Sequence, residues 1–202
     1  MAASETVIAN LALAHLGNKD AIGTLETDTS REAEVCRTFY DTARDELLRV
    51  FPWPFATKFA ELTEVEEDPT DEWAYSYRYP SDCVYVRRIF SGERNDDKSS
   101  RIAYKIGADG SGRLIYCDQD DAELEYTFRN EDTTDYPDDF TMTLSYRLAA
   151  YMAPQLTQGD PFGLRDFCYK KYLEALMTAT SGAYMEEQPD EPPESEFITG
   201  RD

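Results

Sequence analysis

Apolar residues recur every three or four positions between residues 30 and 51, the spacing that lays one buried face along an α-helix. The residues on this face are Val35, Cys36, Phe39, Tyr40, Ala43, Leu47 and Val50. Thr29 and Glu32 stand three apart before them, as in a capping box, and Pro52 and Pro54 follow. The pattern therefore predicts a long helix that is capped by Thr29 and ends near Phe51.

Three more stretches have helical spacing, at about residues 4–16, 138–157 and 161–184. Ser4 is placed to cap the first of them. Asp160 and Pro161 have the order of an N-cap followed by proline at the first helical position, so we expect the last helix to begin at residue 161. Pro154 lies in the last turns of the 138–157 helix, where we expect it to kink or end the helix.

The pattern changes between residues 73 and 130 to short runs rich in Tyr, Val, Ile and Phe, separated by turn-forming residues. These runs cover residues 73–79, 83–90, 101–106, 113–117 and 123–129. Because the connections are too short for parallel crossovers, we expect antiparallel hairpins in a meander. The predicted fold class is α+β, with an antiparallel helical bundle, an inserted small antiparallel β-sheet and an extended C-terminal tail. Residues 1–185 are expected to form a single domain.

The chain of 202 residues has a formal net charge of −21, from 41 acidic and 20 basic residues. Proteins that grip nucleic acid neutralise phosphates with clustered Lys and Arg, so this composition argues against such binding. The densest basic clusters are the pairs Arg87–Arg88 and Lys170–Lys171, which we interpret as solvated or ion-paired side chains. An acidic surface suits a protein past which DNA slides, and solubility alone explains it equally well.

Residues 186–202 hold seven acids and three prolines, so this acidic, Pro-rich tail is expected to be disordered unless a partner orders it. The four cysteines lie far apart without a Cys-x-x-Cys pair, which is typical of buried thiols in a reducing compartment. The chain shows no basic leader segment and no run of about 18 apolar residues. We therefore expect a soluble protein that is made in the cytoplasm and has no membrane partner.

His15 is the only histidine and lies on a short amphipathic helix, which favours a surface or helix-packing role over catalysis or metal binding. The glycine-rich run at 107–112 lies between two predicted strands and lacks the end of a P-loop, which favours a hairpin loop. Asp118, Asp120 and Asp121 resemble part of a calcium loop without its glycine and final glutamate. Nothing selects a catalytic pair among the carboxylates. The sequence predicts no catalytic residue, cofactor or metal.

Four aromatic residues follow the long helix within nine positions, and we call them the aromatic knuckle: Phe51, Trp53, Phe55 and Phe59. Buried aromatic residues usually seal a core, here against the third and fourth helices. Aromatic residues are also enriched at the centre of protein interfaces. The knuckle is therefore interpreted as core, with a contact surface as the alternative.

Three motifs occur in order in the first sixty residues: N-L-A-L-x-x-L-G at 10–17, S-R-E-A-x-x-C-R-x-x-Y-D-x-A-R-D-x-L-L-R at 30–49, and F-P-W-P-F-A at 51–56. A fourth, Y-P-D-D-F-x-x-x-L-S-Y-R-L-A-A-Y-M-A-P-Q-L, covers 136–156. In these motifs the chain resembles the head-to-tail adaptor family of tailed bacteriophages. That family includes the tail tubular protein A type and related head-completion connectors.

The resemblance implies a virion structural protein rather than an enzyme. Members of the family form a dodecameric ring beneath the portal protein, where they close the DNA-filled head and conduct DNA. The ring is also the platform for the next tail component, a nozzle or tail tube protein. The resemblance further implies a helical bundle with a β-rich insertion, a place in the virion neck, and DNA that passes through without tight binding.

Tails of family members reach towards the portal, which makes Phe197, Ile198 and Arg201 candidate portal-docking residues. Loops that project from a compact body are candidates for the channel wall. The acids on such loops are Asp96, Asp97, Asp118, Asp120 and Asp121. Two other classes of function stay open: a virion-associated glycosidase that degrades the cell wall, and a protein-binding module that forms no ring.

Overall fold

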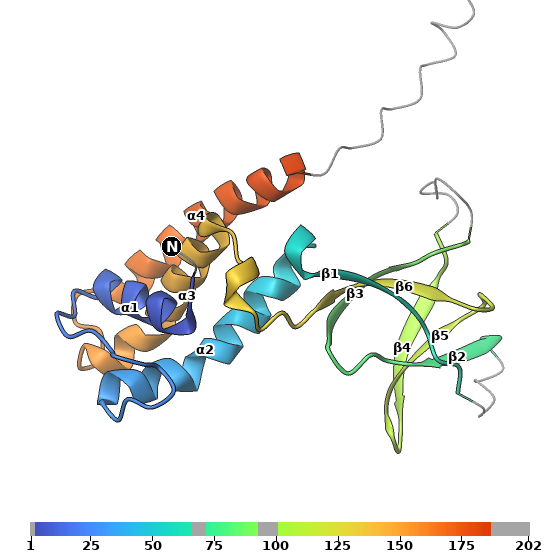
Figure 1. The fold of residues 1–202 in the computed structure, drawn as a ribbon, viewed down its shortest axis with the longest axis horizontal. Coiled ribbons are helices and arrows are strands. Elements are labelled where there is room, and N and C mark those ends of the chain that lie inside the picture. Colours follow the sequence, from blue (N-terminus) through green and yellow to red (C-terminus); the bar gives the residue numbers. More distant parts are fainter. Residues whose placement is uncertain (1–2, 66–71, 93–100, 187–202) are drawn as a thin grey trace, which may run out of the picture.

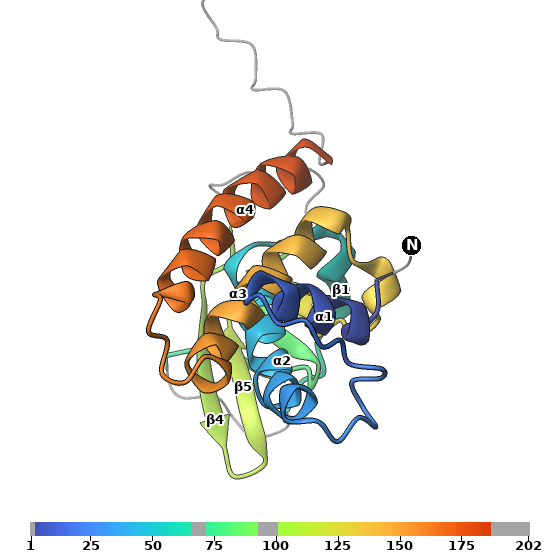
Figure 2. The ribbon, with the colours of Figure 1, turned by 90° about the vertical axis from the view of Figure 1, so that its left-hand side faces the viewer.

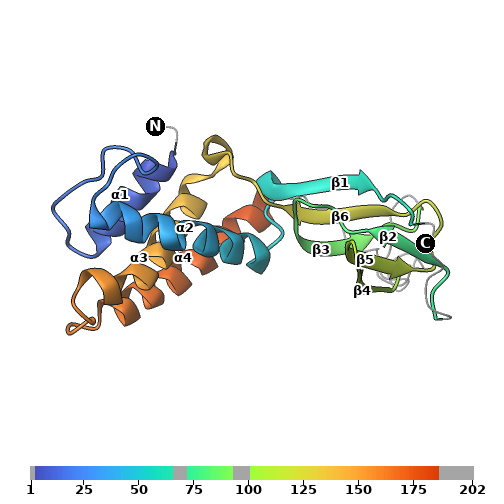
Figure 3. The ribbon, with the colours of Figure 1, turned by 90° about the horizontal axis from the view of Figure 1, so that it is seen from below.

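The computed structural model describes residues 3–65, 72–92 and 101–186. Helices occupy one end of an elongated molecule and strands occupy the other, as Figure 1 and Figure 3 show. The helical lobe consists of α1 (Glu5–His15), α2 (Arg31–Val50), α3 (Asp138–Leu156) and α4 (Leu164–Glu186). The strands lie between α2 and α3 in the sequence, and the predicted α+β fold class is confirmed.

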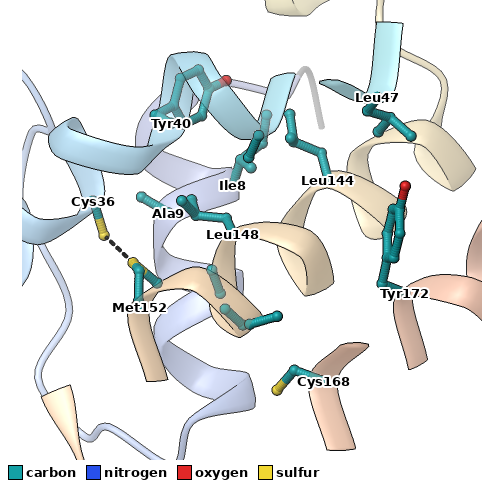
Figure 4. Packing of buried hydrophobic residues seen from close by; sticks show 14 of the residues in the cluster. Ile8, Ala9, Cys36, Tyr40, Leu47, Leu144, Leu148, Met152, Cys168 and Tyr172 are labelled. Carbon is teal, nitrogen blue, oxygen red and sulfur yellow. Dashed lines mark hydrogen bonds between the residues drawn. The ribbon is translucent and has the colours of Figure 1, made fainter. Parts of the chain in front are cut away.

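Helix α3 is the centre of the helical lobe because it contacts α1, α2 and α4. In Figure 4, Leu144 and Leu148 of α3 point towards Ile8 of α1, and the sulfur of Met152 lies 3.2 Å from that of Cys36 on α2. Helix α3 continues through Pro154 and ends at Leu156. Helix α4 lies on the outside of the lobe, with α3 as its main neighbour (Figure 2).

The prediction that Thr29 caps α2 is wrong, because Ser30 has that role. The Oγ of Ser30 accepts a hydrogen bond from the backbone N–H of Ala33, at 3.3 Å. Asp28 fixes this position, since its Oδ1 accepts from the N–H of Ser30 at 2.8 Å. This bond forms an Asx-type turn before the helix, which leaves Thr29 exposed outside the first turn.

Helix α4 begins at Leu164, three residues later than predicted. Asp160 still caps it, since its carboxylate accepts from the N–H groups of Leu164 at 2.7 Å and Arg165 at 3.0 Å. Positive φ angles at Gly159 (91°), Asp160 (62°) and Gly163 (67°) place the intervening residues in a loop. Pro161 therefore lies in the turn before the helix rather than in its first turn.

The strand lobe consists of six strands, five of which the sequence predicts. They are β1 (Thr57–Glu61), β2 (Tyr75–Arg78), β3 (Cys83–Ile89), β4 (Tyr104–Asp109), β5 (Gly112–Cys117) and β6 (Glu123–Phe128). A short 3-10 helix, η1 (Pro54–Ala56), precedes the unpredicted β1, and η3 (Thr133–Asp135) follows β6. The glycine-rich run forms the β4–β5 hairpin, as predicted.

The strands form two three-stranded antiparallel sheets, in the orders β1-β6-β3 and β2-β5-β4. Antiparallel pairing is confirmed, but the single sheet and the meander are wrong. Within the described residues, β4 and β5 alone are neighbours both in sequence and in a sheet. The connections from β1 to β2, β2 to β3, β3 to β4 and β5 to β6 all lead from one sheet to the other. The two sheets share one core, to which Ile115 of β5 and Leu124 of β6 belong.

The helical lobe has a separate core, and Phe128 at the end of β6 packs against both cores. The four cysteines are all buried and unpaired: Cys36, Cys83, Cys117 and Cys168. Across the described ranges, none of the helices combines the length and the apolar character needed to cross a membrane.

Candidate functional site

The aromatic knuckle divides between core and surface. Trp53 is 1% exposed, its Nε1–H donates to the carbonyl oxygen of Leu47 at 2.8 Å, and its ring meets Phe140 of α3 edge-on at 5.0 Å. Phe55 meets the same Phe140 at 4.8 Å, and Phe51 meets Trp53 at 5.2 Å. These three residues connect the end of α2 to α3.

Phe59 does not join that core. It lies on β1 and is 59% exposed, and its ring centre is 5.7 Å from that of Phe90. In the part of the chain that the structure describes, β1 pairs with β6 alone and is an edge strand of its sheet. The interpretation of the aromatic knuckle as core therefore describes Phe51, Trp53 and Phe55, while Phe59 is part of the surface.

A groove of about 480 Å³ lies where the end of α2 approaches β3, α3 and α4. We call it the arginine groove, and its lining residues are Glu46, Arg49, Val50, Tyr85, Arg87, Arg147, Tyr169 and Tyr172. Three arginines and one glutamate give it a formal charge of +2, in a chain whose net charge is −21. It is therefore a basic site on an acidic protein.

Arg87 on β3 joins the strand lobe to the C-terminal end of α2. Its Nη2 donates to the carbonyl oxygens of Phe51 at 2.8 Å, Leu48 at 3.3 Å and Arg49 at 3.3 Å. Its Nε donates to the hydroxyl of Thr127 at 2.8 Å. These carbonyls would otherwise be left without partners at the helix end. Burial lowers the pKa of Arg87 from its ordinary value.

Arg49 and Arg87 both lie over the ring of Tyr85, at 5.2 Å and 4.5 Å from its centre. Among the described residues, no carboxylate lies within ion-pair distance of either guanidinium. Arg49 is also exposed. The two positive charges are balanced by a tyrosine ring and by helix carbonyls, which leaves them able to attract an anionic group.

Arg147 on α3 is neutralised within the groove. Its Nη2 lies 2.7 Å from Glu46 Oε2 and also donates to the hydroxyl of Tyr151 at 2.7 Å. That hydroxyl donates in turn to Glu46 Oε1 at 2.6 Å. The guanidinium lies over the rings of Tyr169 and Tyr172 at 5.4 Å and 5.3 Å, so it organises the aromatic wall of the groove.

Sequence reasoning missed this groove because its arginines come from three different elements. Arg49, Arg87 and Arg147 are tens of residues apart, and the sequence marks only Arg87, as a member of the pair Arg87–Arg88. The interpretation of that pair as solvated or ion-paired does not describe Arg87, which donates to helix carbonyls. Its neighbour and one member of the second basic pair are ion-paired. Arg88 forms an ion pair with Glu125, and Lys171 lies 2.7 Å from Glu174.

The outer face of α4 is a second unusual surface. Four large side chains recur along it at intervals of four, four and seven residues, which places them on one side of the helix: Tyr169, Leu173, Met177 and Tyr184. All four are exposed, and Met177 is 74% exposed. The neighbouring side of α4, which includes Cys168 and Ala179, is buried against α3. The lobe therefore leaves an apolar stripe uncovered.

The predicted channel acids lie partly within the described residues. Asp118, Asp120 and Asp121 are exposed on the loop between β5 and β6. The Oδ1 of Asp118 accepts from the N–H of Ala74 at 2.9 Å, which ties this loop to the start of β2. Asp96 and Asp97 lie outside the described residues, as do the three candidate portal-docking residues Phe197, Ile198 and Arg201.

His15 packs between helices. Its ring stacks on Tyr146 of α3 at 3.9 Å, and its Nε2 lies 3.0 Å from the hydroxyl oxygen of Ser145. Since that hydroxyl donates to the carbonyl of Met142 at 2.7 Å, it accepts from His15. Burial lowers the pKa of His15 below 6.5. The described part of the chain holds no group of three or more His, Cys, Asp or Glu residues arranged to bind a metal ion.

A cavity of about 570 Å³ lies in the strand lobe. Its lining includes one carboxylate, Glu61, together with Arg78 and Arg113. Glycoside hydrolysis uses a pair of carboxylates on either side of the scissile bond, and this cavity does not present such a pair.

No family model matches this chain, and a search of curated proteins finds no match either.

Proposed function

We propose that this chain is a head-to-tail adaptor of a tailed bacteriophage. In this proposal it is made in the host cytoplasm and assembles as a dodecameric ring beneath the portal protein in the virion neck. The ring closes the DNA-filled head, conducts DNA without tight binding and offers an attachment platform for a nozzle or tail tube protein. The observation that carries the proposal is the apolar stripe on the outer face of α4.

The stripe has the composition of an interface centre rather than of a solvent-facing helix. Aromatic residues and methionine are enriched in interface cores, and contiguous apolar patches on soluble proteins mark contact sites. Tyr169, Leu173 and Met177 supply such a patch on successive turns of one helix, and Tyr184 follows on the same side beyond Thr180 and Ser181. A second copy or a neighbouring virion protein that covers it would remove this apolar surface from water.

The positions of the sequence motifs support the same proposal. The stretches that resemble the adaptor family fall on α1, α2, the knuckle and α3, which supply most of the buried residues in the core of the helical lobe. The strand lobe interrupts them between Thr57 and Phe128. The resemblance implies a helical bundle with a β-rich insertion, and the fold is compatible with that expectation.

The acidic surface fits a channel through which DNA moves. DNA carries one negative charge per roughly 1.7 Å, and lysines or arginines on a channel wall would hold its phosphates by releasing counterions. Carboxylates such as Asp118, Asp120 and Asp121 leave the duplex hydrated. An acidic wall therefore lets DNA slide during ejection.

The test mixes the purified chain with the portal protein of the same virus and counts copies by mass measurement and particle imaging. We expect a monomer or weak oligomer alone, because identical acidic subunits repel each other, and a dodecameric ring on the portal. Met177→Glu places a charge in the stripe and should abolish the ring. Thr178→Glu is the matched control, since it adds the same charge at an exposed neighbour outside the stripe.

Two results would contradict the proposal. One is that the wild-type chain forms no ring on the portal, and the other is that Met177→Glu assembles as well as Thr178→Glu. Cell-wall turnover by the purified chain would favour the glycosidase instead. A small complex without a central hole would favour the protein-binding module.

A further inference from the structure

The arginine groove has the electrostatic properties of an anion site. Arg49 and Arg87 face it without a carboxylate partner among the described residues. The partners of Arg87 are neutral oxygens, those of the Thr127 hydroxyl and of the last carbonyls of α2, so they leave its positive charge uncompensated. Charge-assisted hydrogen bonds from guanidinium to carboxylate or phosphate are stronger than neutral ones.

The walls of the groove select the kind of anion. Val50 is 53% exposed, and the rings of Tyr85 and Tyr169 are also exposed beside the arginines. Flat aromatic and aliphatic surfaces pack well against apolar and aromatic side chains. A small inorganic ion would leave these walls uncovered. A peptide that alternates carboxylates with proline or aromatic residues would satisfy both the charges and the walls.

The chain itself contains such a peptide. Residues 187–202 hold six acids, three prolines, the apolar pair Phe197–Ile198 and one arginine, for a formal charge of −5. These residues lie outside the described part of the structure. Their charge is opposite to that of the groove, which is +2. Charge complementarity of this kind favours association and fixes its orientation.

The length of the segment matches the distance it must cover. Tyr169 in the groove and Glu186 at the end of α4 are 17 residues apart on one helix, which corresponds to about 26 Å at about 1.5 Å per residue. An extended segment gains about 3.3 Å per residue, so residues 187–202 reach up to about 53 Å. A segment of this length is therefore long enough to turn back along α4 and reach the groove.

We propose that residues 187–202 bind in the arginine groove of their own chain. Carboxylates of the segment pair with Arg49 and Arg87, and Phe197 packs on the wall formed by Val50 and Tyr85. A segment tethered at Glu186 has an effective concentration in the millimolar range, which favours its own groove over that of a second copy. The contact forms within one chain, so it can be detected in the monomer before any ring assembles.

The test uses the full chain with a photoactivatable benzoylphenylalanine in place of Phe197. After irradiation, monomeric and dimeric species are separated, and the crosslinked peptides are identified by mass spectrometry. We expect crosslinks in the monomer that join position 197 to the peptides containing Val50, Tyr85 or Tyr169. Their yield should fall in 0.5 M salt, because exposed charges are screened.

Arg49→Glu is the decisive variant, since the Arg49 side chain is exposed and its loss leaves the Arg87 cap of α2 in place. We expect it to reduce the groove crosslink roughly fivefold, the scale of an exposed ion pair. Lys19→Glu is the matched control, because it makes the same charge change at an exposed position on the loop after α1. That variant should leave the yield unchanged.

Three outcomes would overturn the proposal. Groove crosslinks confined to the dimer would identify a second copy as the occupant. Crosslinks scattered over the surface would show that the segment has no fixed site. An equal yield in Arg49→Glu and Lys19→Glu would show that the charge of the groove does not hold the segment.

Discussion

Trp53 stabilises the junction between the two lobes because both its polar N–H group and its apolar ring are in contact with other residues. Its indole N–H is satisfied by the carbonyl of Leu47, and its ring is enclosed by Phe51 and Phe140. Phe59, six residues later, extends from β1 with more than half of its surface in water. Two members of one aromatic cluster should therefore contribute very differently to the free energy of unfolding.

We expect Trp53→Ala to reduce the free energy of unfolding by about 3–5 kcal/mol, because it leaves a cavity and an unpaired carbonyl. Phe59→Ala should change it by less than about 1 kcal/mol, as is usual for exposed positions. Urea unfolding followed by circular dichroism measures both. Equal losses in the two variants would show that Phe59 is covered by other parts of the protein.

His15 should make stability depend on pH. Burial lowers its pKa below 6.5, so the unfolded chain binds a proton more readily than the folded chain does. The neutral ring is fully compatible with the fold above pH 6.5. Stability is then lost as the pH falls from 6.5 to the lowered pKa of the folded protein, below which the loss is complete.

In His15→Gln the side chain has no charge to gain, so this variant should become more stable relative to wild type as the pH is lowered from 7.5 to 5. The comparison uses urea unfolding of both proteins at each pH. Carboxylate titration affects the two proteins alike and cancels in the difference. A difference that does not change with pH would contradict the prediction.

At the scale of elements, the helices follow from the sequence because their signal is local. The apolar stripe of α2 repeats every three or four residues over twenty positions. The predicted cap of α2 and the predicted first residue of α4 differ from the structure because turns formed by Asp28 and Asp160 decide them, and several residues nearby have suitable side chains. Periodicity locates a helix to within a few residues, and side-chain hydrogen bonds fix its ends.

The pairing of the strands is not revealed by local sequence patterns. Strand β1 was missed because its sequence, TKFAE, has little alternation and follows directly on the aromatic knuckle. Its partner β6 begins 62 positions after Glu61, at Glu123, and no local pattern reports such a pairing. Whether a stretch forms a strand can be judged from a short run of residues. The order of strands in a sheet depends on contacts between runs that lie far apart in the sequence.

The cap of α2 can be tested with two adjacent residues. Ser30→Ala removes the acceptor for the N–H of Ala33 and should cost about 1 kcal/mol in the free energy of unfolding. Thr29→Ala should change it by no more than a few tenths of that amount, since Thr29 is exposed outside the helix. Thermal and urea unfolding provide the measurement. A larger loss in Thr29→Ala would restore Thr29 as the cap.

At the scale of the whole molecule, the arginine groove and the stripe on α4 depend on how elements meet. The groove exists because α2, α3, α4 and β3 converge, and the sequence separates its residues Glu46 and Tyr172 by more than half of the chain. The sequence does not identify the stripe, because α4 has apolar residues on more than one side. Only the packing of α4 on α3 shows which of these residues remain exposed. Candidate sites of this kind require the tertiary structure.

The net charge of −21 should prevent DNA binding despite the arginine groove. We expect no measurable binding of a duplex by fluorescence anisotropy near physiological salt. Replacing both Asp118 and Asp120 with Lys should produce detectable binding at low salt that weakens as salt is raised, because the new charges release counterions. Replacing both residues with Asn is the control, since it removes negative charge without adding phosphate ligands.

Tight, salt-sensitive duplex binding by the unmodified chain would contradict this prediction and favour a DNA-gripping role. Equal behaviour of the Lys and Asn variants would show that the β5–β6 loop does not approach the duplex.

The pairing of β1 with β6 places the exit of the chain from the helical lobe beside its return, since Thr57 and Thr127 are partners. The lobe beyond them supplies little to the helical core apart from Val84, Phe128 and the Arg87 cap. Such a stem makes the strand lobe separable from the helices. A chain in which the stretch between these two strands is shortened or exchanged should therefore keep the arrangement of its helices.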